Sequence, residues 1–242
     1  MASTGQTISA FDAELDTLRG TICEMGGIAE QALADAMEAL VRRDLDAAAR
    51  VVERDHRLDA LETQIEHQAV QIIARCAPKA DDLREVVAAL KIAGVVERIG
   101  DYAKNIAKRV PSLVDSRIHP VALFPEMARI AAEMVHNVLD AFAARDAVKA
   151  AQVRDRDVAV DDFYNSIFRA LLTHMMENPH NITPATHLLF VARNLERIGD
   201  HATNVAEMVY FAATGQHLGD RARGADTTGI AADDIGDDPY GR

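Results

Sequence analysis

The 242-residue chain contains no tryptophan, and aromatic residues make up only 5% of it. Alanine and leucine are abundant instead, so the core has to be built from small and straight-chain side chains. Such residues favour closely packed helices over sheets, which are rich in β-branched and aromatic residues. Hydrophobic residues still make up 49% of the chain, which is enough to bury a core and excludes disorder throughout.

Cysteines and long apolar runs are also scarce. The two cysteines, Cys23 and Cys76, are too few for a disulfide scaffold, and we expect both as free, buried thiols. No apolar run approaches the ~18 residues that a membrane helix needs. The start, MASTGQTISAFDAEL, is polar and acidic, unlike a secretion signal. We therefore expect a soluble, cytoplasmic protein.

Basic residues are in the minority. The chain has 26 Lys and Arg against 38 Asp and Glu, which gives a formal charge of −12. Nucleic acid is bound through clustered Lys and Arg, so this balance argues against nucleic acid as the main partner. The negative charge favours cations or basic protein surfaces as partners.

Apolar residues recur at spacings of three and four along nearly the whole chain, the period of one face of an α-helix. Asp44 and Asp146 stand where N-caps are needed, and Thr183 followed by Pro184 fits an N-cap and a first helical residue. Six helices are predicted, at about 7–43, 45–75, 80–110, 121–144, 146–176 and 184–214. The Gly- and Asp-rich segment 215–242 is predicted to be a disordered tail.

An internal repeat organises these helices. VVERIGDYAKNIAKR (95–109) matches NLERIGDHATNVAEM (194–208) at an offset of 99, and Asp55 and Asp59 match Asp157 and Asp161 at an offset of 102. Each unit of about 100 residues contains three helices. The sequence therefore predicts an all-α chain of two tandem three-helix bundles, residues 7–112 and 119–214.

Acidic residues form four pairs at i, i+4 spacing in repeat-related places. Like charges at this spacing share one side of a helix and destabilise it by a few tenths of a kcal/mol per pair, so we expect a compensating cation. The pairs are Asp55/Asp59 and Asp157/Asp161 on the second helices, and Glu97/Asp101 and Glu196/Asp200 on the third.

The helix register brings these pairs together. If the second and third helices form an antiparallel hairpin that turns at Pro78, Asp59 lies level with Glu97, and Asp55 with Asp101. The same construction in the second unit places its turn between Asn178 and Pro179 and aligns its two acidic pairs. Packed helices lie about 8–10 Å apart, so four carboxylates converge in each unit. Oxygen ligands without cysteine favour Mg, Mn, Ca or iron over a structural zinc.

The acidic residues fall opposite the apolar stripe of each third helix, so the predicted sites lie on the bundle surface, outside the core. A solvated acidic face neutralised by Arg98, Lys104 and Lys108 remains the alternative. Asn105 and Asn204, one turn further along, fit either carbonyl ligands or hydrogen-bonding partners.

Other motifs point to weaker possibilities. Three Glu-x-x-His elements match those of di-iron carboxylate bundles, but none is preserved in the repeat, and His201 is at most an accessory ligand. These elements are Glu53/His56, Glu133/His136 and Glu177/His180.

Glycines inside the third helices indicate that another segment approaches the helix backbone closely. These glycines are Gly94, Gly100 and Gly199. No Gly-rich phosphate loop, nucleophile elbow or Ser/His/Asp constellation is present, so we do not expect an enzyme.

The doubled ERIGDxAxN, the DxxxD of DHRLDALETQIE and the segment APKADDLR resemble the PhoU family, over residues Phe11 to Thr214. This resemblance implies tandem three-helix bundles whose E/D-x-x-x-D motifs bind multinuclear metal clusters on the bundle surface. It also implies a cytoplasmic homodimer that negatively regulates phosphate uptake. Such a protein acts with the Pst phosphate ABC transporter and the PhoR sensor kinase to hold the phosphate-starvation response off.

The resemblance assigns the metal ligands residue by residue and implies iron or zinc. Together with the preference of oxygen ligands, the expected ions are iron, manganese, zinc or magnesium. In the second unit Tyr164 and Phe168 replace Glu62 and Glu66, so the resemblance does not imply equal occupancy of the two units. Membrane contact is expected only through partners. The alternatives are a di-iron carboxylate oxidase and a metal-free helical scaffold whose acidic faces bind a basic partner. The ligands are Asp55, Asp59, Glu97, Asp101, Asp157, Asp161, Glu196 and Asp200.

Overall fold

A computed structural model of the chain describes residues 3–116, 118 and 123–219. Within these residues the protein is helical and contains no strand. The elements are α1 (Ser3–Arg42), α2 (Leu45–Arg54), α3 (His56–Cys76), α4 (Asp81–Ala107), η1 (Val110–Leu113), α5 (Leu123–Ala144), α6 (Ala147–Glu177), η2 (Pro179–Asn181) and α7 (Ile182–Thr214).

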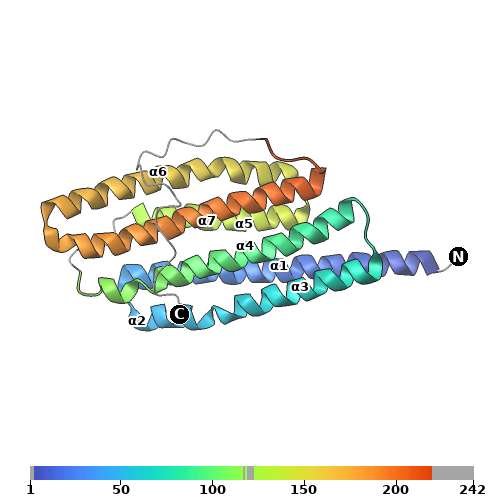
Figure 1. Cartoon of the computed structure of the whole chain (residues 1–242), viewed down its shortest axis with the longest axis horizontal. Helices are drawn as coiled ribbons and strands as arrows, with labels where there is room; N and C mark the ends of the chain where they lie inside the picture. Colours follow the sequence, from blue (N-terminus) through green and yellow to red (C-terminus); the bar gives the residue numbers. More distant parts are fainter. Residues whose placement is uncertain (1–2, 117, 119–122, 220–242) are drawn as a thin grey trace.

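The helices form two bundles that lie side by side (Figure 1). Helices α1 to α4 make up the first bundle, and α5, α6 and α7 the second. The bundles meet where α4 packs against α7 and α1 against α5, while α3 and α6 lie on opposite outer edges (Figure 1). The predicted fold, two tandem three-helix bundles, is confirmed.

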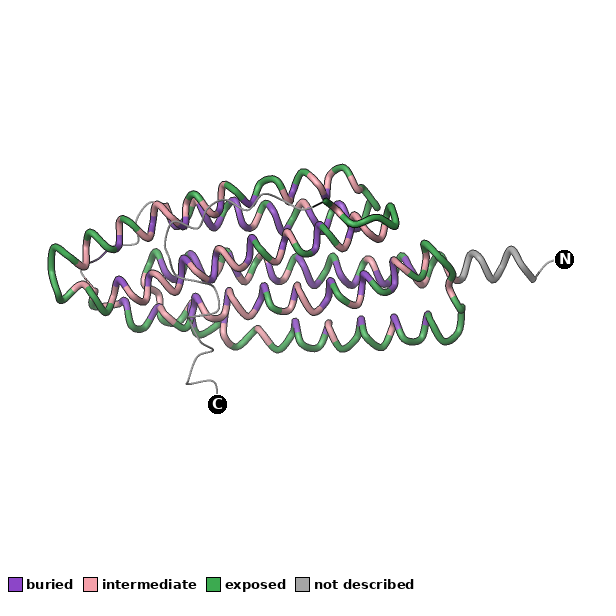
Figure 2. The backbone as a smooth tube through the Cα atoms, turned by 45° about the horizontal axis from the view of Figure 1, so that its top comes forward, coloured by how far each residue is buried: buried purple, intermediate pink, exposed green. Residues whose placement is uncertain are grey.

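Apolar residues at helical spacing build one core that runs through both bundles. Figure 2 shows buried positions recurring on the sides of the helices that face their neighbours, whereas the outer side of α3 is exposed. Burial of each large aliphatic side chain contributes about 1.5–3 kcal/mol. The stripes predicted on the third helices are buried along their length: Ile92, Val96, Ile99, Ala103, Ile106 and Val110 on and just after α4, and Val191, Leu195, Ile198, Ala202 and Val205 on α7.

The turn after the first helix of each bundle is capped as the sequence predicts. The Asp44 carboxylate accepts a hydrogen bond of 2.9 Å from the Ala47 amide, and the Asp146 carboxylate accepts bonds from the first-turn amides of α6. Each cap follows an arginine in the left-handed conformation, with φ 56° at Arg43 and φ 53° at Arg145. The two turns are therefore built alike, as expected for a repeat.

Two helix boundaries differ from the prediction. The helix predicted at 45–75 is divided at Asp55, where the Leu58 amide bonds to the Asp55 carbonyl in an i→i+3 pattern. Asp55 keeps helical torsion angles, φ −57° and ψ −39°, so the division is a local tightening. The N-cap predicted at Thr183 is wrong, because the short helix η2 precedes α7, which begins at Ile182 after Asn181.

Two further expectations concern the cysteines and the C-terminal segment. Cys23 and Cys76 are free, as predicted, but both are exposed and not buried. Most of the predicted disordered tail, residues 220–242, lies outside the described residues. No helix in the described ranges has the length and apolar character needed to cross a membrane.

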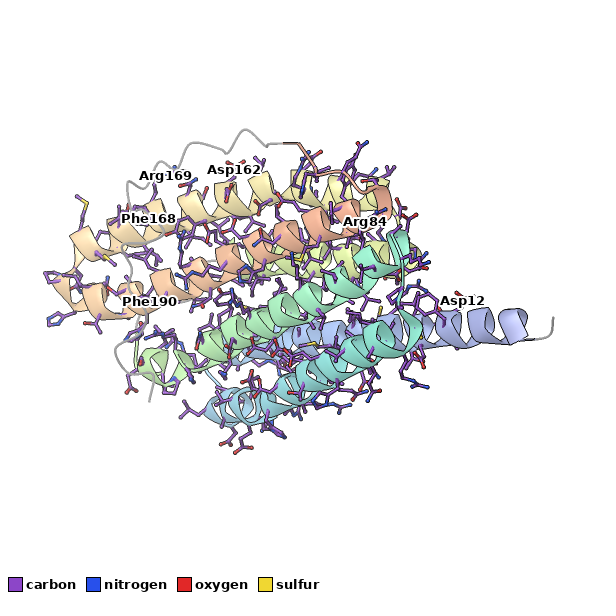
Figure 3. The ribbon with its side chains drawn as sticks, turned by 45° about the vertical axis from the view of Figure 1, so that its right-hand side comes forward. Asp12, Arg84, Asp162, Phe168, Arg169 and Phe190 are labelled. Atoms are coloured by element: carbon purple, nitrogen blue, oxygen red, sulfur yellow. The ribbon has the colours of Figure 1, made fainter. Side chains whose placement is uncertain are left out.

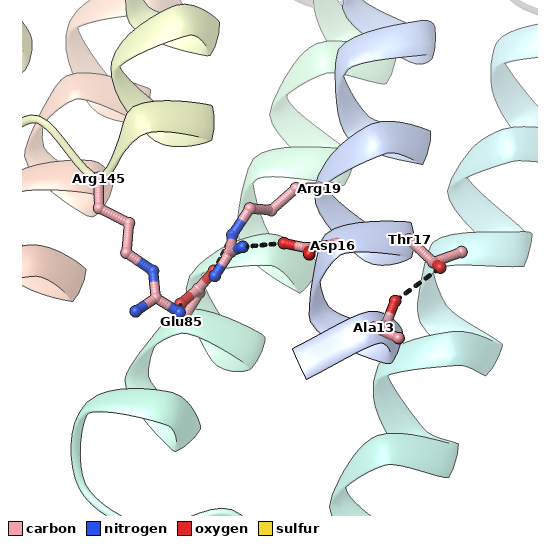
Figure 4. Close-up of polar contacts among 6 residues, drawn as sticks. All are labelled: Ala13, Asp16, Thr17, Arg19, Glu85 and Arg145. Carbon is pink, nitrogen blue, oxygen red and sulfur yellow. Dashed lines mark hydrogen bonds and ion pairs between the residues drawn. The ribbon is translucent and has the colours of Figure 1, made fainter. Parts of the chain in front are cut away.

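Ion pairs and hydrogen bonds tie the bundles together. Glu85 of α4, 5% exposed, accepts a hydrogen bond of 2.5 Å from Arg19 of α1 and pairs with Arg145 at the turn between α5 and α6 (Figure 4). Arg43, which matches Arg145 in the repeat, donates to carbonyls in the segment that joins the bundles. Both left-handed arginines thus reach beyond the helices that flank them. The carbonyls that Arg43 binds are those of Val114, Ser116 and Ile118.

Candidate functional site

The second and third helices of each unit pair in the predicted register. A Cβ at Gly100 would lie 2.1 Å from Leu58 Cδ1 and 3.9 Å from Asp55 Oδ1. A Cβ at Gly199 would lie 3.0 Å from Asp157 Oδ1. The close backbone approach predicted from these glycines is therefore present, and it brings each acidic pair on α4 or α7 level with its counterpart.

Lys104 lies within the first acidic cluster. Its ammonium donates to Asp55 Oδ2 at 2.5 Å and also to the Asp101 carboxylate, linking α4 to the start of α3. Burial alone would lower the pKa of Lys104, but the hydrogen bonds to Asp101 and Asp55 raise it overall. The amine is therefore a permanent cation between two predicted metal ligands.

The rest of this cluster is short of positive charge, and Glu97 shows the effect most clearly. Burial, followed by the carboxylates of Asp101, Glu62 and Asp59, raises the pKa of Glu97 to about 7. The carboxyl group is thus half-protonated near neutral pH, whereas an ordinary glutamate is ionised there. Protonation of Glu97 therefore offsets part of the repulsion among these carboxylates.

Two further glutamates of α3 belong to the same cluster. Burial and the charges of Glu66 and Asp59 raise the pKa of Glu62, against the opposing effect of Arg98. Glu62 and Glu66 thus extend the predicted set to six neighbouring carboxylates. The sequence carried one signal for them, because they follow Asp59 by three and seven residues and so share its side of the helix.

The second cluster contains a different internal cation. Arg193 of α7 donates from Nη1 to Glu196 Oε1 at 2.8 Å, and its guanidinium lies 5.8 Å from the centre of the Tyr164 ring. The ring of Phe168, labelled on α6 in Figure 3, lies 6.4 Å from that of Tyr164. Two aromatic side chains thus occupy the places that glutamates hold in the first unit.

The second cluster is also deeper than the sequence predicts. Asp157 is only 4% exposed, and the side chains of Arg193 and Glu196 are each 13% exposed. Burial, and then the Asp200 charge, raises the pKa of Glu196 to about 8, although Arg193 acts in the opposite direction. The prediction of a surface site is wrong for Asp157, because Gly199 lets α6 approach α7 closely at this level.

Tyr102 and His201, which are equivalent in the repeat, meet where the two bundles join. The Tyr102 hydroxyl lies 3.2 Å from His201 Nε2, and Arg197 lies over the Tyr102 ring. Burial, Arg98 and Arg197 lower the pKa of His201 to about 4, so its imidazole is neutral at physiological pH. His201 therefore contacts α4 across the bundle interface, a role that its sequence position beside Asp200 did not indicate.

The Glu-x-x-His elements do not form a core site. A di-iron carboxylate bundle directs these side chains into its interior. Here the six residues of the three elements are all exposed, and His136 pairs with Glu30 on the surface at 3.3 Å. The structure thus contradicts the di-iron alternative.

Comparison with known proteins decides the family. A family model described as the PhoU domain matches residues 22–110 and 124–209. A phosphate-specific transport system accessory protein PhoU homolog from Zymomonas mobilis is 56% identical over 223 residues, which cover 92% of this chain and 94% of that protein. The chain belongs to the PhoU family.

Solved structures of PhoU proteins agree with the fold. The crystal structure of PhoU from Pseudomonas aeruginosa matches with a TM-score of 0.80 and 37% identity, over 85% of this chain and 100% of that one. The phosphate transport system regulatory protein PhoU from Streptococcus pneumoniae matches with a TM-score of 0.81 and 25% identity, over 86% and 99%. A second PhoU homolog, from Rhizobium meliloti, is 49% identical over 220 residues, 89% of this chain and 92% of that protein.

The metal clusters implied by the PhoU resemblance can be tested against these side chains. The donors are carboxylate oxygens, which suit hard divalent cations, and Glu196 Oε2 is buried without a hydrogen bond. In the described part of the chain, however, no three His, Cys, Asp or Glu side chains are already gathered around one point. Lys104 and Arg193 draw carboxylates toward themselves instead. The donor set fits a metal in its chemistry, and binding requires these side chains to rearrange.

Proposed function

We propose that this chain is an accessory and regulatory protein of a phosphate-specific transport system. In this role it is a negative regulator that holds the phosphate-starvation response off, as an adaptor between the Pst phosphate ABC transporter and a PhoR-type sensor kinase. The observation that carries the proposal is the doubled ERIGD hairpin, in a chain 56% identical over nearly its full length to a relative with that name.

The geometry suits an adaptor. The two bundles share one core, and Arg145 of the second bundle pairs with Glu85 of the first, so they present fixed surfaces to partners. The role proposed is non-enzymatic binding, in the cytoplasm and as a homodimer. The acidic face between α3 and α4 offers a surface for cations or basic partner segments.

We include metal binding by the two acidic clusters in the proposal. The four acidic pairs would hold the ions, and iron, manganese, zinc or magnesium would supply positive charge that offsets repulsion among the carboxylates. In the first unit, Asp55 and Asp59 of the α2–α3 segment would be held against the acidic pair of α4. In the second, Asp157 and Asp161 of α6 would be held against the acidic pair of α7.

The regulatory role can be tested in the organism that encodes the chain. Deletion of its gene should raise alkaline phosphatase activity in phosphate-rich medium, and the wild-type gene on a plasmid should return it to the repressed level. A plasmid that encodes Glu97→Gln with Asp101→Asn tests the role of the acidic cluster. Normal accumulation of this variant shows that any loss of repression is not caused by loss of the fold. Phosphatase activity that stays repressed after deletion would contradict the regulatory role.

A metal-free scaffold is the second candidate, and one observation favours it. Lys104 and Arg193 already place one cation in each cluster. Elemental analysis of the purified protein distinguishes the two candidates. Metal retained in the wild-type protein and lost from the variant of Glu97 and Asp101 supports metal binding, whereas no retained metal after dialysis supports the scaffold.

A further inference from the structure

An apolar groove lies between the C-terminal part of α1 and the N-terminal half of α5. Its volume is about 390 Å³. Val41 in its lining is 48% exposed, although large aliphatic side chains are usually buried. The groove therefore offers apolar surface that the described part of the chain leaves in contact with solvent. The aliphatic lining comes from Leu33, Met37 and Val41 of α1 and from Pro125, Ala128 and Ala132 of α5.

The repeat explains why the groove opens at this end of the α1–α5 interface. At an offset of 102, Gly26 of α1 corresponds to Ala128 of α5, and Met37 corresponds to Leu139. A Cβ at Gly26 would overlap Leu139 Cδ1, so the glycine lets α1 and α5 pack closely there. At the repeat-related place Ala128 carries this Cβ, and it lines the groove together with Met37. A close contact at one end of the interface thus corresponds to a groove at the other.

Charged side chains of both signs flank the groove. On α1, Glu38 and Arg42 pair with each other and are 55% and 72% exposed. On α5, Arg129 pairs with Glu126 and Glu133, and all three are about half exposed. Three negative charges thus stand beside two positive ones, in a chain whose formal charge is −12. This face is closer to neutral than the chain as a whole.

A second copy of the chain matches this pattern of charges. Two molecules of charge −12 repel each other, and the repulsion is smallest where the charges of the facing surfaces are balanced. In a two-fold symmetric contact the same surface patch of both copies meets, so each pairing between the copies occurs twice. If two α1 helices cross antiparallel near Leu40, Glu38 of each copy lies level with Arg42 of the other.

We propose that the groove between α1 and α5 is the contact surface for a second copy of this chain. Val41 of each copy enters the groove of the other, and the Glu38–Arg42 pair within each copy is exchanged for two pairs between the copies. This inference rests on the homodimer included in the proposed function. The groove follows only residues 33–42, roughly 15 Å of α1. The contact is therefore small, and the dimer should dissociate at the low micromolar concentrations used for spectroscopic unfolding.

Sedimentation velocity of the full chain over a series of concentrations tests the surface. Interference optics suit the measurement because the chain has no tryptophan. The wild type should shift from monomer to dimer as its concentration rises. Val41→Glu should raise the dimer dissociation constant at least about hundredfold, tenfold for each of its two copies. Val148→Glu, at a position of α6 that is 68% exposed, is the matched control and should leave the constant unchanged.

Charge reversal tests the pairing between the copies. Glu38→Arg and Arg42→Glu should each be monomeric, because every pairing between identical copies then joins like charges. A mixture of the two variants should form a heterodimer, because each Arg then faces a Glu. Circular dichroism of each variant confirms that it is folded. Variants that stay monomeric on mixing would overturn the proposed pairing of Glu38 with Arg42.

The remaining outcomes separate the claims. A dimer that Val41→Glu and both charge reversals leave unchanged would overturn this assignment of the groove while leaving the homodimer intact. If the same variants lost binding to the phosphate transporter instead, the groove would belong to that partner and the inference would be overturned. A wild-type chain that stays monomeric throughout the series would overturn both this inference and the homodimer part of the proposed function. The deletion phenotype tests the regulatory role separately.

Discussion

Glu85 of α4 pairs with Arg145, which lies in the turn between α5 and α6, and this ion pair spans the two bundles (Figure 4). Arg19 of α1 binds the other oxygen of the same carboxylate. A single buried glutamate thus connects one helix of its own bundle with the neighbouring bundle. Because charged hydrogen bonds stabilise a protein more than neutral ones, Glu85 is a strong point of contact between the units.

Glu85→Gln should lower the free energy of unfolding by about 1.5–3 kcal/mol, because it weakens two charged hydrogen bonds and leaves both arginines without their shared carboxylate. Urea unfolding followed by circular dichroism measures the change. Glu38→Gln is the control, since the Glu38–Arg42 pair is exposed and its loss should change stability by less than about 0.5 kcal/mol. Equal effects of the two substitutions would contradict the importance of the buried pair.

Gly100→Ala should destabilise the protein by about 1–3 kcal/mol, because its new Cβ would meet Leu58 Cδ1 at 2.1 Å and push α3 away from α4. Gly27→Ala provides the contrast, since nothing lies within 4 Å of a Cβ there. This control should stabilise α1 by about 0.5–1 kcal/mol, the ordinary preference for alanine in a helix. Thermal unfolding of both variants decides the point, and a stabilised Gly100→Ala variant would disprove the close contact.

The metal-free protein should lose stability as the pH rises toward neutrality. The pKa of Glu97 rises from its ordinary value of 4.5 to about 7 in the folded protein. Between these values the folded protein holds a proton that the unfolded chain releases, so the free energy of unfolding falls with rising pH. Glu97→Gln should therefore be more stable than the wild type at pH 8 but not at pH 4.5.

Urea unfolding in EDTA at both pH values measures this difference. Glu207→Gln, on an exposed position of α7, should show no such pH-dependent gain. A constant difference between Glu97→Gln and the wild type across this range would show that Glu97 does not carry the effect.

Added metal should stabilise the wild-type protein. A ligand that binds only the folded state at 100 times its dissociation constant contributes about 2.7 kcal/mol. Thermal unfolding in EDTA, and then with Mn²⁺, iron or Zn²⁺, should show a higher midpoint for a metal that binds. Identical midpoints in all four conditions would rule out metal as a stabiliser of the fold.

Local sequence patterns predict much of this fold. The apolar spacing of α4 and α7, the caps at Asp44 and Asp146 and the hairpin register all depend on contacts within one helix or one hairpin, so they follow from the sequence. The break at Asp55 does not, because this residue keeps helical torsion angles and only the hydrogen-bond pattern changes.

The candidate site is less predictable than the fold. The sequence indicates the four acidic pairs and names Lys104 as one possible neutralising residue, but it does not show that Lys104 lies between Asp55 and Asp101. The ion pair between Arg193 and Glu196 lies within α7 at i, i+3 spacing, whereas the depth of the second cluster depends on how closely α6 and α7 pack. The repeat alignment carried a signal for this ion pair, since arginine stands at 193 where the first unit has Gly94.

The most direct test of the proposed adaptor role is a binding measurement with its two partners. The purified chain would be mixed with the detergent-solubilised phosphate transporter and with the cytoplasmic part of the PhoR-type kinase from the same organism. The molar mass of each complex would be measured by size-exclusion chromatography with light scattering. The account predicts a complex with each partner and a ternary complex with both. The absence of binding to either partner, with all three proteins folded and at micromolar concentration, would contradict it.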